Sequence, residues 1–89
     1  MFSREELKEI DKDYFTVTAA HSFSVTVTSK NTLHEWHILS KEGKGWKSCD
    51  VYHRHHHEDP FHFQEHKPTL KEALHSIRQH DEYILEKNS

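Results

Sequence analysis

The sequence contains very little cysteine, glycine and proline. Its single cysteine, Cys49, excludes an intramolecular disulfide and the zinc-finger patterns that need two or more thiolates. With two glycines and two prolines, the chain has no glycine-rich phosphate-binding loop and no flexible linker. Its 89 residues suffice for one domain over 1–89 and leave no room for a second core.

Long hydrophobic runs and a strong net charge are also absent. No apolar run approaches the ~20 residues of a membrane span, so no membrane association is expected, and the charged N-terminus does not resemble a signal peptide. A formal net charge of −3 argues against a broadly basic protein and against DNA as a partner. Together with the single cysteine, these features predict a cytoplasmic protein.

Histidine, in contrast, is abundant. The chain has eleven histidines, and protonation of all of them would change the net charge from −3 to +8. Because a free imidazole titrates near pH ~6.5, the sign of the net charge reverses close to neutrality unless burial or a metal keeps the rings neutral. Six of the eleven lie in the stretch 51–66: His53, His55, His56, His57, His62 and His66.

Two helices are predicted from capping boxes and apolar spacing. Ser3 and Glu6 form an S-x-x-E box at the start of a short helix over residues 4–11. Thr69 and Glu72 form a second box, which begins a long helix from residue 70 to the mid-80s. The apolar stripe of this helix consists of Leu70, Ala73, Leu74, Ile77, Ile84 and Leu85.

Between the helices, five stretches have the alternation or composition of β-strands. They are residues 14–20, 23–28, 33–40, 47–55 and 61–66. The third is apolar on both faces, which predicts a strand that is central or partly covered on its outer face. Residues 41–45, with both glycines, are expected to form the most flexible connection. The order predicts an α+β fold: a small, five-stranded, antiparallel sheet with a short N-terminal helix and a long C-terminal helix on one face.

Side-chain parity also predicts how neighbouring strands pair, because a one-residue slip turns every side chain to the other face. The expected pairs in the first and last hairpins are Val17 with Val25, His53 with Phe63, and His55 with Phe61. This register points both phenylalanines inward, on the same face as the two histidines. The opposite face would then contain Arg54, His62, Gln64 and His66.

His53 and His55 are the leading candidates for metal ligands. Alternate residues on a strand point to the same side, and neutral imidazole is the commonest metal-binding side chain. In the long helix, Asp81 falls inside the apolar stripe and His80 lies at its edge, and a carboxylate there is costly unless it is paired or metal-bound. If this helix crosses the last two strands, the four residues form a His/Asp site for zinc or another divalent ion.

Two alternatives remain open for these residues. The histidines can be ordinary surface residues of a half-exposed strand, with Asp81 capping a helix break or pairing with a basic side chain. The same hairpin can also form an RNA-binding or small ribonuclease-like module. The outward rings and cations for RNA are Tyr14, Trp46, Tyr52, Lys41, Lys44, Lys47 and Arg54. The acid–base candidates are His62, His66, Arg54 and Glu65.

A non-enzymatic role is favoured over an enzyme. Cys49 alternates with Val51 on the inward face of a strand, where a thiol is buried and inert. We therefore expect an intracellular binding or interaction domain whose histidine-rich hairpin binds a divalent metal. An unidentified protein partner or a second copy can pair with an exposed sheet edge.

Overall fold

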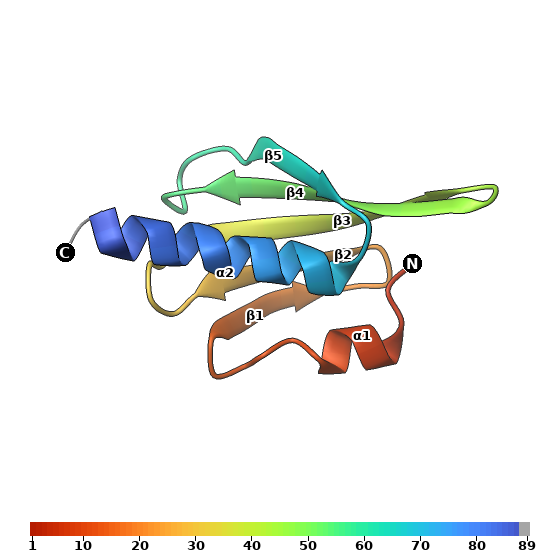
Figure 1. Cartoon of the computed structure of the whole chain (residues 1–89), viewed down its shortest axis with the longest axis horizontal. Helices are drawn as coiled ribbons and strands as arrows, with labels where there is room; N and C mark the ends of the chain where they lie inside the picture. The colour runs from red at the N-terminus through yellow and green to blue at the C-terminus, as the bar shows by residue number, and fades with distance from the viewer. Residues whose placement is uncertain (88–89) are drawn as a thin grey trace.

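The structure is one antiparallel sheet with a long helix across one face (Figure 1). The computed structural model describes residues 1–87. The elements in chain order are α1 (Arg4–Lys8), β1 (Phe15–Ala20), β2 (Ser24–Ser29), β3 (Glu35–Gly43), β4 (Trp46–Arg54), β5 (His62–Lys67) and α2 (Leu70–Lys87). The five strands lie in the sheet in the order of the chain, so that each strand pairs with the next. This arrangement confirms the α+β fold class predicted from the sequence.

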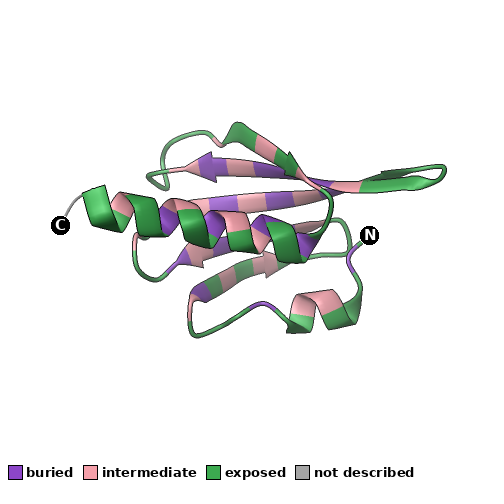
Figure 2. Cartoon of the chain, viewed as in Figure 1, coloured by how far each residue is buried: buried purple, intermediate pink, exposed green. Residues whose placement is uncertain are grey.

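The hydrophobic core lies between the sheet and α2 (Figure 2). Its members alternate along each strand, because successive side chains point to opposite faces. The buried apolar side chains at this interface include Val25, Val27, Trp36, Ile38, Val51, Leu70, Ala73 and Ile77. Full burial of one such side chain contributes about 1.5–3 kcal/mol, so α2 is held by its apolar stripe and not by helix propensity.

The central position predicted for the third strand is confirmed, since β3 has two strands on each side. Trp36 and Ile38 face α2 and are buried. On the opposite face, His37 and Leu39 are half-buried although no helix covers them. The second apolar face therefore packs beside neighbouring side chains of the open sheet surface.

Helix α1 begins at the predicted capping box. The backbone N–H of Glu6 donates to Ser3 Oγ at 3.1 Å, and the Ser3 N–H donates to Glu6 Oε1 at 3.0 Å. The helix ends at Lys8, earlier than the predicted 4–11. Phe2 before the helix and Ile10 after it are both buried in the core, so the chain leaves the helix where Ile10 turns inward.

The predicted register of the first hairpin is wrong by two residues at Val17 and by three beyond the bulge, where Ala19 pairs with Thr26. Val17 pairs with Val27 and not with Val25, and Thr18 is left unpaired by a bulge. Phe23 lies outside β2 and is 50 % exposed. Side-chain alternation does not distinguish Val25 from Val27 as the partner of Val17, because a shift of two residues keeps both valines on the same face. The length of the turn determines the register, and the alternation of apolar and polar residues contains no information about turn length.

The third strand extends further than predicted, and the fourth begins and ends one residue earlier than predicted. Residues 41–43 belong to β3, and the turn consists of Lys44 and Gly45 alone, with φ of +79° at Gly45. The Trp46 indole lies over Gly43, where an added Cβ would be 2.3 Å from Nε1. The stretch expected to be the most flexible connection is thus mostly a paired ribbon, which extends beyond the rest of the sheet (Figure 1).

The predicted register of the last hairpin is also wrong. His53 pairs with His62, and Tyr52 pairs with Phe63. A bulge at Gln64 inserts one extra residue into β5, which reverses the parity that the alternation implies. As a result His62 lies on the same face as His53, and the expectation that it faces away is wrong.

Neither phenylalanine of this hairpin faces the core as predicted. Phe61 is half-buried beneath the Arg54 guanidinium, whose Cζ lies 4.1 Å from the ring centroid. Phe63 is 49 % exposed on the open face of the sheet. The inward position of β5 belongs to Glu65, whose carboxylate accepts a hydrogen bond from the Ser76 hydroxyl of α2.

Leu33, in the turn before β3, has a backbone conformation that leucine rarely adopts. Its φ of 63° lies in the left-handed region, and its side chain is 70 % exposed. The turn is closed by a hydrogen bond from Leu33 N–H to Ser29 O at 2.8 Å and by one from Ser29 N–H to His34 O at 3.0 Å. A left-handed residue other than glycine costs about 1–2 kcal/mol, so these bonds hold a strained residue directly beside His34.

Substitution of Leu33 by glycine is expected to raise the free energy of unfolding by about 0.5–1 kcal/mol. Glycine removes the left-handed strain and loses no buried surface, and its extra unfolded-state entropy offsets part of the gain. Urea denaturation of Leu33→Gly measures the effect. The matched control is Leu85→Gly, an exposed leucine in α2 that should lose about 0.5–1 kcal/mol. Equal losses in both variants would contradict strain at Leu33.

Candidate functional site

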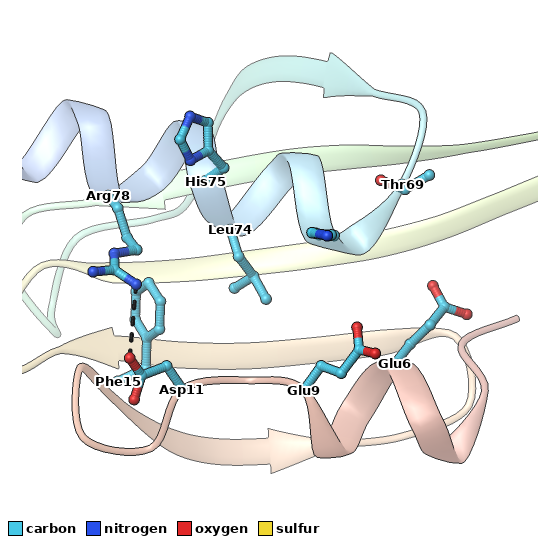
Figure 3. A pocket seen from close by; sticks show the side chains of 9 residues that line it. Glu6, Glu9, Asp11, Phe15, Thr69, Leu74, His75 and Arg78 are labelled. Atoms are coloured by element: carbon cyan, nitrogen blue, oxygen red, sulfur yellow. Dashed lines mark ion pairs between the residues drawn. The ribbon is translucent and has the colours of Figure 1, made fainter.

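The structure contains a groove between α1 and α2 that includes none of the predicted metal ligands (Figure 3). Its volume is about 610 Å³, and its apolar floor includes Phe15 and Leu74. The predicted ligands lie instead beside the second half of α2, which contains His80 and Asp81. The groove and the histidines are therefore two separate features.

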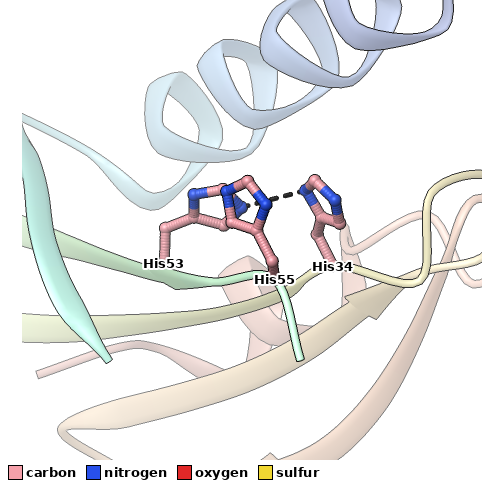
Figure 4. A group of neighbouring side chains, drawn as sticks. All are labelled: His34, His53 and His55. Carbon is pink, nitrogen blue, oxygen red and sulfur yellow. Dashed lines mark hydrogen bonds between the residues drawn. The ribbon is translucent and has the colours of Figure 1, made fainter. Parts of the chain in front are cut away.

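Three histidines converge where β4 ends and β3 begins (Figure 4). His34, His53 and His55 each offer one ring nitrogen within 4.8 Å of the others. His53 Nε2 and His34 Nδ1 are 3.1 Å apart and share a hydrogen bond. Within residues 1–87, this is the one group of three or more His, Cys, Asp or Glu side chains that has such spacing. The structure thus brings the predicted His53 and His55 together and adds His34.

The pairing of β3 with β4 brings the three rings to one place. Trp36 lies directly opposite His53 in this antiparallel pair. His34 is two residues before Trp36, and His55 is two residues after His53. Because side chains repeat every two residues, both fall on the same face as that pair, just beyond the ladder. Their rings stack with centroids 4.4 Å apart.

His53 is the buried centre of the cluster. Its side chain is 2 % exposed and stacks on the Trp36 indole, with ring centroids 3.9 Å apart. Two further imidazoles lie against it: the His80 ring centroid is 5.2 Å away and the His62 centroid 5.5 Å away. His80, a predicted ligand on α2, therefore lies beside the three-histidine group.

Burial favours the neutral form of two of these imidazoles, His53 and His34. Burial, together with smaller effects from the neighbouring His34 and His55 rings, lowers the pKa of His53 to about 3. Burial also lowers the pKa of His34, with a smaller effect from His55. A metal ion binds the neutral ring through its free lone pair, so at neutral pH the cluster needs little proton release to accept one.

The spacing of the nitrogens is close to that of a tetrahedral metal site. An ion with Zn–N bonds of ~2.0–2.1 Å holds its ligand nitrogens about 3.3 Å apart. The His34–His53 pair is already at 3.1 Å, and no distance within the set exceeds 4.8 Å. His55 is exposed and lies beyond the end of β4, so its rotation can close the remaining gap. An all-imidazole set suits Zn²⁺, Cu²⁺ and Ni²⁺.

Asp81 is buried as its place in the apolar stripe implies, but its oxygens face other partners. Its side chain is 0 % exposed, and it accepts hydrogen bonds from Tyr14 Oη at 2.9 Å and Thr32 Oγ1 at 3.2 Å. Burial and the Asp81 carboxylate raise the pKa of Tyr14. Thr32 Oγ1 in turn accepts from the His34 N–H at 3.3 Å. Asp81 thereby holds the turn that presents His34 and is not one of the three converging residues.

His34 is the site residue that sequence reasoning missed. It belongs to the stretch that was assigned to the third strand, while all candidate ligands were sought on the last hairpin and the long helix. The sequence contains a signal for it. His34 and Trp36 form a His-x-Trp pattern, and His53 and His55 form a His-x-His pattern. When Trp36 pairs with His53 in antiparallel strands, His34 and His55 also meet. That pairing register was needed to connect them.

The open face of the sheet shows where the predicted RNA contacts lie. Arg54 forms hydrogen bonds to both carboxylate oxygens of Glu35, at 3.0 and 3.1 Å, and this lowers the pKa of Glu35. Lys41 Nζ lies 2.7 Å from the Asp50 carboxylate. Burial alone would raise the pKa of Asp50, but hydrogen bonds from Lys41 and His66 lower it. Two of the expected cations are therefore already paired with carboxylates.

The predicted aromatic rings are also not on one surface. Tyr52 lies on the open face opposite Phe63, as expected. Tyr14 is half-buried and donates its hydroxyl to Asp81, so its assignment as an outward ring is wrong. Trp46 is exposed on the ribbon that extends from the sheet.

Comparisons with known proteins leave the site geometry as the basis for a functional proposal. No family model, no curated protein and no solved structure matches the chain. Within the described residues, neither helix has the length and apolar character needed to cross a membrane.

Asp81→Ala is expected to lower the free energy of unfolding of the metal-free protein by about 2–4 kcal/mol. The substitution removes two hydrogen bonds to a buried carboxylate and leaves the Tyr14 and Thr32 hydroxyls without that acceptor. Urea denaturation in the presence of a chelator measures the loss. The neighbouring exposed residue provides the control, since Glu82→Ala should change stability by less than ~0.5 kcal/mol. Similar small effects in both variants would refute the role of Asp81 in holding the turn.

The metal-free protein should lose stability as the pH falls from about 6.5 toward 3. The folded-state pKa of His53 is depressed to about 3, so in this window the unfolded chain binds a proton that the folded chain does not. This contribution is complete above pH ~6.5 and decreases by at most about 1.4 kcal/mol per pH unit below it. Urea midpoints across pH 4–7 should show a steeper slope for the wild type than for His53→Phe. The control is a phenylalanine substitution of the exposed His21, which should keep the wild-type slope. A wild-type slope in His53→Phe would show that His53 is not the source of the pH dependence.

Proposed function

We propose that the protein is a small intracellular binding domain that holds a divalent transition-metal ion at His34, His53 and His55. Zinc is the ion we favour, because it accepts all-imidazole sites and needs no carboxylate or thiolate. The observation that supports the proposal is the convergence of three ring nitrogens from two strands within 4.8 Å.

Three properties of the cluster favour a metal site over surface histidines. His53 is buried, whereas a histidine without a function on a half-exposed strand would be exposed to solvent. The strained Leu33 and the Asp81–Thr32 hydrogen bond fix the turn that brings His34 to the other rings. The lowered pKa values of His34 and His53 keep both rings in the form that binds a cation.

His80 is the candidate for a fourth ligand. Its ring lies against both Trp36 and His53, with centroids 5.2 Å from each. With His80 bound, the site would be a closed structural centre that links α2 to the sheet. With water in the fourth position, it would have the composition of a three-histidine site that activates water. We favour the closed, non-enzymatic form, because α2 places a fourth imidazole beside the group.

In this proposal, the ion stabilises a surface that a partner binds. It would connect the 55–61 loop to the 30–34 turn, beside the exposed His56 and His57. The outer strands β1 and β5 leave two sheet edges for a protein partner or a second copy, which sedimentation with and without zinc would detect. A cytoplasmic location is consistent with the free, buried Cys49. An RNA-binding or ribonuclease-like role has less support, since Lys41 and Arg54 are already paired with carboxylates.

A titration of tag-free protein with Zn²⁺ at pH 7.5 tests the proposal. The wild type should bind one ion with submicromolar Kd, and free zinc at ~100 Kd should add about 2.7 kcal/mol of stability and raise Tm. His34→Ala and His55→Ala should each weaken binding by tenfold or more. Calorimetry measures Kd, thermal unfolding measures the rise in Tm, and histidine NMR shifts identify the rings that bind. Weaker binding in His80→Ala would indicate the closed site, and unchanged binding would indicate the open one.

The matched controls are His56→Ala and His57→Ala, two exposed histidines next to the site whose loss should leave Kd unchanged. Zinc binding should also weaken at pH 5.5, because protons compete with a metal ion for imidazole nitrogens. Binding that weakens equally in all four variants, or that leaves Tm unchanged, would reduce the histidines to adventitious surface ligands.

A further inference from the structure

The groove between α1 and α2 has the form of a binding site for a small molecule (Figure 3). Its volume of about 610 Å³ lies within the ~300–1,000 Å³ typical of ligand sites. Phe15 from β1 and Leu74 from α2 form an apolar floor. None of the clustered histidines lines it, so the inference is independent of the proposed metal site.

The two walls of the groove have opposite charges. The wall formed by α1 and the turn after it has the carboxylates of Glu6, Glu9 and Asp11, and the wall formed by α2 has the side chains of Lys71, His75 and Arg78. One ion pair spans the groove, between Arg78 Nη1 and Asp11 Oδ2 at 3.6 Å. Among residues 1–87, no second ion pair joins the walls, so Glu9 and Lys71 face the same space without touching.

The walls are held apart by the core. Phe2 and Ile10 flank α1 and are 4 % and 3 % exposed, while α2 is anchored by Ala73 and Ile77. A closer approach of α1 to α2 would have to pull these side chains out of the core, which is costly for each one. The separated charges are therefore available to a third molecule whose own charges fit between them.

We propose that the groove binds a small zwitterion with an apolar body, of the class of hydrophobic dipeptides. The ligand's ammonium group would face Glu9 and its carboxylate would face Lys71. Its side chains would cover Leu74, beside the buried Phe15. The acidic wall would repel a nucleotide or other anion, and the basic wall would repel a simple cation. A dipolar molecule is the ligand class that complements both walls at once.

The test is an NMR titration of chelator-treated protein with L-leucyl-L-leucine, followed by backbone and methyl shifts. Shifts should map to Phe15, Leu74 and the two walls, with a Kd on the order of 1 mM for a ligand of this size. The N-acetylated and the C-amidated dipeptides, which each lack one charge, should bind about three- to tenfold more weakly. Glu9→Gln and Lys71→Met should produce the same loss for the unmodified dipeptide.

The matched controls, Glu5→Gln and Lys8→Met, change exposed residues of α1 that do not line the groove and should leave Kd unchanged. Equal binding of the charged and blocked dipeptides, shifts outside the groove, or no shifts at 20 mM ligand would overturn the proposal. Repeating the titration in His55→Ala separates the two sites. Unchanged dipeptide binding there supports the groove whether or not zinc binds, and a loss would overturn the independence of the groove.

Discussion

The pairing of Trp36 with His53 is the contact on which the rest of the structure depends. It sets the register of the two central strands, and the two stacked rings fill the middle of the core beneath α2. Each neighbouring feature is displaced from it by two residues, which is why His34 and His55 meet. An imidazole serves in this place because it is flat enough to stack on the indole and, when neutral, inexpensive to bury.

The sequence predicts the order of helices and strands well, because each element is specified by a local pattern such as a capping box or an alternation of apolar residues. The two capping boxes mark both helix starts, and the apolar stripe of α2 places Asp81 in the interior. Such patterns do not predict the registers of the outer hairpins. Each register depends on a single bulge, at Thr18 or at Gln64, which is determined by turn geometry and tertiary packing. The misplaced Phe63 and His62 both follow from one extra residue in β5.

The candidate site was predictable only in part for the same reason. His53 and His55 are an obvious pair from their spacing on a strand, but the third imidazole comes from a segment nineteen residues away in the chain. Asp81 was recognised as an unusual buried carboxylate, and its partners, Tyr14 and Thr32, are 67 and 49 residues distant. No periodicity connects such residues, so their meeting had to come from the three-dimensional arrangement.

These separations also imply an order of assembly along the folding pathway. The β3–β4 ribbon closes through a two-residue turn, and loop closure of this kind is fast because little chain entropy is lost. The histidines at its open end would therefore meet while the chain is still incomplete. The contacts of Asp81 wait for α2, which follows all five strands in the chain, so the three histidines would come together before the helix covers them.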